Sequence, residues 1–231
     1  MAGELAAALI ADMVDNRPRL ENLMQQEGSR VLHEEFMLAE QGTLPDRHSR
    51  LTGARRAGAR AWLRHLAASL ASVWDGGPPD FQQQLERQVQ GARERLEQLE
   101  LEEYAALERE GLSGDAEADA RRVTLSAHVR VFAEAVGAVA VPQGLDGPAF
   151  GRRVTDILRR SGARRRDIER QAFEAWTGSP MEGVMEGTRA TAAPPEPEVV
   201  RTLEAAAVWS FVHVTADALG ELLGDPTEGD A

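Results

Sequence analysis

The chain has 231 residues and a formal net charge of −12, and its shares of apolar and charged residues, 42 % and 28 %, are those of an ordinary globular protein. It contains no cysteine, which excludes disulfides, thiolate metal sites and cysteine nucleophiles. The acidic balance disfavours non-specific binding to nucleic acid or anionic lipid. Because no stretch approaches the ~18 uninterrupted apolar residues of a membrane span, we expect no membrane contact and a cytoplasmic protein.

Helical periodicity recurs along most of the chain, and aromatic residues are scarce at 5 %. Together these features predict an all-α fold, a bundle of six to eight helices. The first helix is expected at residues 3–16 and the second at about 19–40. The third, at about 46–74, is basic in its first half and apolar in its second, and the sequence DGGPPD from Asp75 marks its end.

A long helix over residues 79–111 is the predicted centre of the bundle. Its apolar residues follow one another by steps of four and three, which is typical of a seam along one side of a helix. These residues are Leu85, Val89, Ala92, Leu96 and Leu99. The seam spans about two heptads before it meets Glu103, which is short for a free-standing coiled coil. It therefore predicts either a packing surface within one chain or a dimer seam formed by Leu85, Val89, Leu96 and Leu99.

The remaining elements follow from turn signals and apolar periodicity. We expect a helix from about 113–115 to 140, two short helices at about 148–160 and 164–176, and a strongly apolar helix at about 197–223. Residues 177–197 have no helical period and are interpreted as a mobile or wrapped linker. The predicted domains are a helical bundle over 1–144 and a C-terminal group of helices over 145–223, followed by a disordered tail at 224–231.

The segment 150–176 partly resembles a DNA-binding helix-turn-helix. Gly162 would lie in the turn, and a run of arginines begins the second helix, where such motifs contact phosphates and guanine edges. The candidate nucleic-acid-binding residues are Arg152, Arg153, Arg164, Arg165, Arg166 and Arg170. Other positions depart from the motif, because Leu158 is bulky where a small residue is usual and Gln171 stands at a core position. The alternative is two amphipathic helices with solvated arginines that pair with nearby acids.

A second basic face lies on the predicted helix at 46–74. Its members are Arg47, Arg50, Arg55, Arg56 and Arg60. These residues could bind phosphate or an acidic partner. The interpretation that we favour is that they pack against acidic helices of the same chain, such as the segment containing Glu100, Glu102 and Glu103.

Histidine offers little support for a metal or cofactor site. The Glu-x-x-His pairs of a di-metal bundle are absent, as is His-Glu-x-x-His, so no metal is expected. His128 and His213 lie in apolar helices, where a histidine is more often part of the core than a ligand. Either could hold a haem or sense pH, but we expect no cofactor.

Known catalytic motifs are missing from the sequence. A phosphate-binding Gly-x-x-x-x-Gly-Lys loop is impossible without lysine, and Gly-x-Ser-x-Gly does not occur. The sequence therefore favours a non-enzymatic regulatory or scaffold protein that acts through helical protein–protein surfaces as a homodimer, with an unknown protein partner. The alternatives are a DNA-binding regulator that uses residues 150–176 and a haem or small-ligand sensor.

Overall fold

The computed structural model describes residues 2–16, 47–74, 80–112, 116–140, 146–184 and 197–223, together with residue 186 and scattered positions between 22 and 40. Within this part of the chain all regular structure is helical, which confirms the predicted all-α bundle. The elements are α1 (Ala2–Asp15), α3 (Arg47–Val73), α4 (Phe81–Gly91), α5 (Arg93–Glu110), α6 (Ala116–Ala140), α7 (Gly147–Arg160), α8 (Gly162–Thr177) and α10 (Pro197–Leu223). The tail at 224–231 and most of the helix predicted at 19–40 lie outside the described residues.

The chain divides into two compact units, which are described separately. One comprises residues 7–155, and the other comprises residues 1–6 and 156–231. The division therefore falls inside α7, whereas the sequence suggested a boundary at 144/145, before that helix begins.

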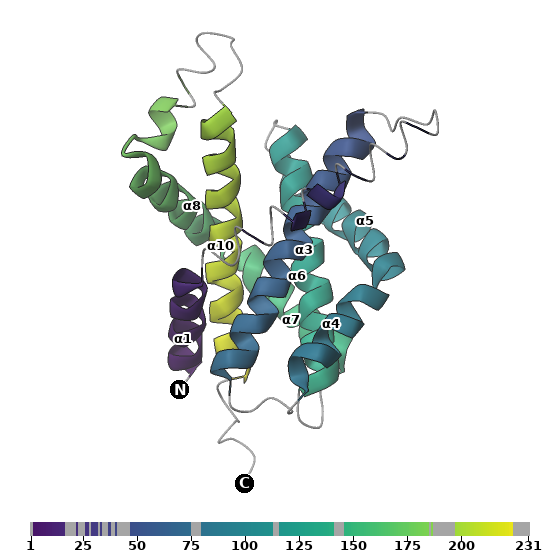
Figure 1. The fold of residues 1–231 in the computed structure, drawn as a ribbon. Helices are drawn as coiled ribbons and strands as arrows, with labels where there is room; N and C mark the ends of the chain where they lie inside the picture. Colours follow the sequence, from purple (N-terminus) through teal and green to yellow (C-terminus); the bar gives the residue numbers. More distant parts are fainter. Residues whose placement is uncertain are drawn as a thin grey trace. The chain divides into compact units, whose positions relative to one another are not determined.

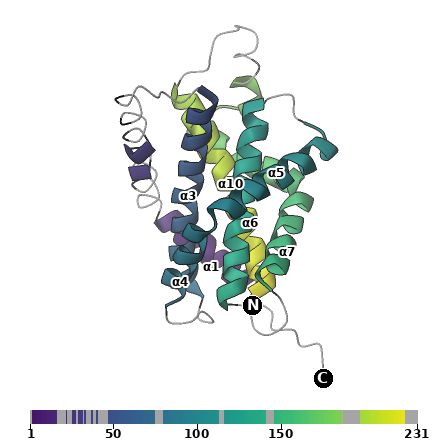
Figure 2. The ribbon, with the colours of Figure 1, turned by 90° about the vertical axis from the view of Figure 1, so that its right-hand side faces the viewer.

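The central helix of the unit formed by residues 7–155 is α6. Helices α3, α4 and α5 all pack on it (Figures 1 and 2). Residues 123–133 of α6 are buried without interruption, and Val129, Phe132 and Val136 are fully enclosed. A helix contacted on several sides needs apolar or small residues all round. This is why α6, and not the predicted helix at 79–111, lies at the centre.

The predicted helix at 79–111 is broken at Ala92, which separates α4 from α5. The Ala92 backbone has φ −92° and ψ 25°, and its N–H donates to the Val89 carbonyl, three residues back, at 3.3 Å. Gly91, which costs a helix about 1 kcal/mol relative to alanine, immediately precedes the break. The chain changes direction there, as Figures 1 and 2 show. The prediction of one continuous helix is therefore wrong.

Glycines line the contact between α6 and α7. A Cβ atom added at Gly147 would lie 2.5 Å from the Glu134 carbonyl oxygen, and one added at Gly137 would lie 2.7 Å from the Phe150 Cβ atom. The two backbones approach closely only because these positions have no side chain. Gly147, which immediately precedes the predicted helix at 148–160, and Gly151, which lies within it, are thus packing residues of α7.

The second unit is built around α8 and α10, which lie side by side (Figure 1). Its core cluster contains Ala172, Phe173 and Ala206. Helix α8 ends at Gly178, which has a φ of +68° and donates its N–H to the Glu174 carbonyl at 2.8 Å. The side chains that pack against the cluster are Met181, Val184, Val199, Leu203 and Trp209. The first part of the predicted linker at 177–197 therefore wraps onto this core, and residues 187–196 lie outside the described residues.

Candidate functional site

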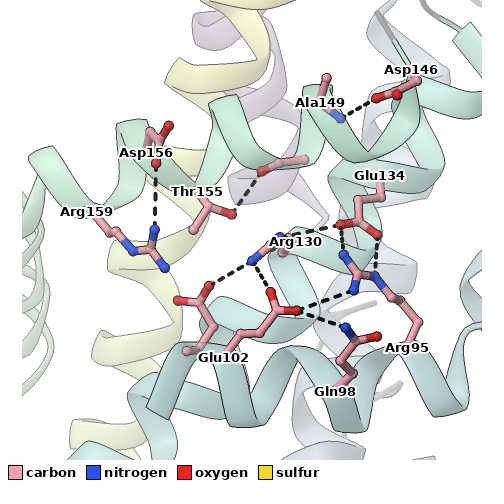
Figure 3. Close-up of polar contacts among 12 residues, drawn as sticks. Arg95, Gln98, Glu102, Arg130, Glu134, Asp146, Ala149, Thr155, Asp156 and Arg159 are labelled. Atoms are coloured by element: carbon pink, nitrogen blue, oxygen red, sulfur yellow. Dashed lines mark hydrogen bonds and ion pairs between the residues drawn. The ribbon is translucent and has the colours of Figure 1, made fainter. Parts of the chain in front are cut away.

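An ion network joins α5 and α6 in the 7–155 unit. At its centre is Arg130, which is 8 % exposed. Its guanidinium lies 2.9 Å from a Glu102 carboxylate oxygen, 3.6 Å from Glu103 and 3.5 Å from Glu134 (Figure 3). Arg95 is the second cation of the network, and it joins Glu134 through two nitrogens, at 2.8 and 3.1 Å. The pKa of Arg95 is raised, chiefly by this hydrogen-bonded contact with Glu134.

The ion network explains an oddity of the sequence. The apolar seam of α4 and α5 is followed by Glu103, and Glu103 is nevertheless only 5 % exposed. A carboxylate can be buried at a seam position when a cation is buried beside it, and Arg130, set in an apolar stretch of α6, supplies that cation. Neither Arg95 nor Arg130 was predicted as a site residue, although a lone arginine within the valine-rich run of α6 was the available signal.

The outer side of α5 carries exposed apolar side chains among exposed glutamates. We define the α5 outer face as Glu94, Glu97, Leu101, Tyr104, Ala105 and Glu108, which recur at helical spacing and are all exposed. Leu101 is 74 % exposed and Tyr104, the only tyrosine of the chain, is 45 % exposed. The opposite face holds Leu99, Glu103 and Leu107, all buried. Helix α5 therefore buries Glu103 beside Leu99 and Leu107, and it exposes Leu101 and Tyr104 to solvent.

Most of the predicted dimer seam is covered by other residues of the same chain. Leu85 and Leu99 are fully buried. Val89, Ala92 and Leu96 pack against a cluster formed by Leu99, Ala127 and Val131. The structure thus contains the intrachain packing surface that was the alternative to a dimer seam formed by Leu85, Val89, Leu96 and Leu99.

The basic face of α3 meets acidic residues of the same unit. The Arg56 Nε donates to a Glu100 carboxylate oxygen at 3.1 Å, and its guanidinium also lies 3.8 Å from Glu97. The contact with Glu100 raises the pKa of Arg56. Arg55 and Arg60 are half-buried. The side chains of Arg47 and Arg50 lie outside the described part of the structure. At Arg56, the structure therefore agrees with the favoured interpretation, that the basic face packs against acidic helices of the same chain.

The segment predicted to be a helix-turn-helix has a very short connection. A single residue, Ser161, separates α7 from α8, and helical hydrogen bonds continue across it at both its N–H and its carbonyl. Gly162 lies inside α8 and does not have a positive φ. A helix-turn-helix needs a turn of three or four residues, so this segment lacks the turn on which the resemblance depended.

The arginines of α7 and α8 have different environments. Arg165 is buried, with its guanidinium carbon 4.2 Å from the centroid of the Phe211 ring. Arg164 forms an ion pair with Asp217 at 2.7 Å, and Arg170 pairs with Asp167 at 3.2 Å. Arg152, Arg153 and Arg166 are exposed. The six candidate arginines therefore do not form a single exposed surface. Arg165 is part of a core, and only some of the others face solvent.

The two candidate histidines belong to different units. In the 7–155 unit, His128 is 2 % exposed, and its Nδ1 lies 2.8 Å from the Thr124 carbonyl oxygen. Burial lowers the pKa of His128 to about 4, and the nearby Arg60 and Arg56 act in the same direction. In the other unit, His213 packs edge-on against Trp209, with 4.7 Å between ring centroids, and burial lowers its pKa as well. His128 is thus a core residue, whereas His213 is partly exposed.

Three comparisons with known proteins, covering family models, curated sequences and solved structures, found no match for this chain. Among the described residues, no group of three or more histidine, aspartate or glutamate side chains is arranged to hold a metal ion. In the same part of the chain, no helix is both long and apolar enough to cross a membrane.

Proposed function

We propose that the protein is a non-enzymatic regulatory or scaffold protein that acts through a helical protein–protein surface. The observation that carries this proposal is the α5 outer face, where Leu101 and Tyr104 are exposed among glutamates. A soluble helix normally keeps its large apolar residues on the side that faces the core. Apolar groups gathered on an otherwise polar surface are a frequent mark of a protein-binding site.

The buried polar groups described above belong to the packing of the helices. Arg130 pairs with Glu102 and lies within 3.6 Å of Glu103 and Glu134, and the Nδ1 of His128 faces the carbonyl of Thr124 in its own helix. An open groove of about 550 Å³ along α4 is lined mainly by polar side chains, whereas small-molecule sites are enclosed and mostly apolar. Its lining residues are Asp80, Gln84, Arg87, Gln88, Gly91 and Ala92.

The proposal is tested by cross-linking the chain in living cells with a photoreactive amino acid placed at position 105, on the α5 outer face. We expect discrete adducts with one or a few polypeptides on a denaturing gel. The same residue placed at Ala11, which is exposed on α1, is the control and should give a different pattern or none. If position 105 yields only the uncross-linked chain, or if the purified chain turns over a substrate, the proposal is contradicted.

Binding to duplex DNA is a second candidate, and the exposed side chains of Arg152 and Arg153 favour it. Such binding would weaken steeply with salt, because each phosphate contact releases counterions. Mobility of a mixed duplex pool, measured at low and moderate salt, tests this candidate. Retardation that is lost in the Arg152→Ala/Arg153→Ala variant would support it, and unchanged mobility of the pool at low salt would exclude it.

A further inference from the structure

The α5 outer face combines two kinds of side chain in a defined order. Leu101, Tyr104 and Ala105 occupy its middle, and Glu97 and Glu108 lie on either side of them along the helix, with Glu94 a turn further out. All six are exposed. From Glu94 to Glu108 the face extends about 21 Å at 1.5 Å per residue, or about four helical turns. An apolar centre between acidic ends is a specific pattern that a partner would have to complement.

The charges of this face are available to a partner to different degrees. The Glu97 side chain is 53 % exposed and has only a 3.8 Å contact with Arg56. Glu100, one position outside the face, is engaged by the Arg56 guanidinium through two contacts. The acidic ends of the face therefore retain negative charge that the chain itself does not neutralise fully, in a protein whose net charge is −12.

We propose that the α5 outer face binds an amphipathic helix of a partner protein whose apolar residues are flanked by lysine or arginine. This inference rests on the proposed function and specifies its surface and the chemistry of the partner. Leucine and aromatic anchors of a partner helix would cover Leu101 and Tyr104, as in other helix-on-surface complexes. Its flanking cations would lie near Glu94, Glu97 and Glu108, where opposite charges speed association and select the partner.

A second copy of this chain complements the face poorly. A two-fold symmetric contact places the same surface patch on both sides, so the three glutamates of one copy would approach those of the other. Like charges brought together in this way oppose association. The acidic ends equally disfavour an anionic membrane surface. Charge thus selects a basic helix over both alternatives.

The test uses the full chain and a fluorescein-labelled peptide of 16 residues, with leucine at positions i, i+3, i+4 and i+7 of each repeat and lysine at the flanking positions. A matched peptide carries glutamate in place of lysine. Fluorescence anisotropy gives the dissociation constants. We expect the lysine peptide to bind more tightly than the glutamate peptide, with an affinity that falls as salt rises.

Three variants locate the binding. Leu101→Gln should weaken the lysine peptide about tenfold, since an anchor at the centre of an interface contributes on the order of that factor. Glu97→Gln/Glu108→Gln should weaken binding about threefold and flatten its salt dependence. Val14→Gln is the matched control, because Val14 is an apolar residue of α1 that is 49 % exposed, and it should leave the dissociation constant unchanged.

Several outcomes would overturn the inference. The inference fails if the two peptides bind equally tightly, or if Leu101→Gln and Val14→Gln have equal effects on binding. It also fails if the chain dimerises as its concentration rises and Leu101→Gln abolishes this dimerisation. The failure of this inference can be told apart from failure of the proposed function. If the cellular cross-links at position 105 persist in the Leu101→Gln and Glu97→Gln/Glu108→Gln variants, a partner exists but does not bind through these side chains. If no adduct forms in any background, the proposed function itself fails.

Discussion

The α5–α6 and α8–α10 pairs join their helices by opposite means. In the α8–α10 pair, Phe173 and Ala206 form the core of the contact, Arg165 packs on the Phe211 ring, and the remaining arginines of α8 are at its edge or exposed. In the α5–α6 pair, the ion network around Arg130 occupies much of the contact, and Leu101 and Tyr104 lie outside it. The first arrangement is explained by stability alone. The second places apolar groups where they add little to folding, and this difference directs attention to α5 as a binding surface.

The largest expected effect comes from removing the central cation of the ion network. Arg130→Met leaves Glu103 buried beside an apolar side chain, and breaking a buried ion pair in this way costs about 3–5 kcal/mol. Urea unfolding followed by circular dichroism measures the loss. The double variant Arg130→Met/Glu103→Leu should recover most of it, because an apolar pair of similar volume can replace a buried ion pair. Equal losses in the two variants would show that the network contributes nothing specific.

The close contact of α6 and α7 should tolerate no side chain at Gly147. The added Cβ of Gly147→Ala would meet the Glu134 carbonyl oxygen, a backbone atom that cannot move without separating the helices. We expect a loss of about 1–3 kcal/mol in the free energy of unfolding. Gly91→Ala is the control, since nothing lies within 4 Å of its added Cβ, and it should stabilise the chain by up to about 1 kcal/mol. Destabilisation by both variants alike would contradict the packing described here.

Acid should destabilise the 7–155 unit through His128. Its pKa is about 4 in the folded chain and ~6.5 when unfolded, so the unfolded state binds the proton first and stability falls as pH decreases through this window. Between pH 7.5 and 5 the contribution lost is about 2 kcal/mol. The His128→Gln variant should show a pH dependence that is smaller by this amount. Parallel curves for the two proteins would mean that His128 titrates normally in the fold.

The smallest effect is expected at the α5 outer face. Leu101→Gln and Tyr104→Gln should each change the free energy of unfolding by less than about 0.5 kcal/mol, because exposed side chains contribute little to folding. Leu99→Ala, on the buried face of the same helix, should cost about 2–5 kcal/mol. Urea unfolding of the three variants measures these changes in the free energy of unfolding. A loss above 1 kcal/mol for Leu101→Gln would show that this residue serves the fold.

Much of the fold could be predicted from periodicity and turn residues, which act locally. The helix at Pro197–Leu223 and the end of α6 at Ala140 were predicted closely. The break at Ala92 was not, because Gly91 signals only a weak preference and the packing of both segments on α6 determines the outcome. The central position of α6 could not be predicted either. Whether a helix is buried on one side or on all sides depends on its tertiary contacts, which the sequence pattern does not show.

The candidate site was much less accessible to sequence reasoning. Pairing of the basic α3 face with Glu100 was anticipated as one of two alternatives, because opposite charges in a single chain tend to meet. The buried position of Arg165 was not anticipated, since a run of three arginines does not reveal which one points toward Phe211. Exposure of Leu101 depends on which side of α5 faces α6, and the buried side holds Leu99, Glu103 and Leu107.

Hydrogen exchange of the full chain tests the central proposal, that the α5 outer face is a binding surface, most directly. Exchange is measured by mass spectrometry with and without a saturating concentration of the lysine peptide. The proposal predicts that protection increases in peptides covering residues 94–110 and remains unchanged in α7, α8 and α10. Protection confined to another helix, or none at all in α5 when the peptide is bound, would contradict it.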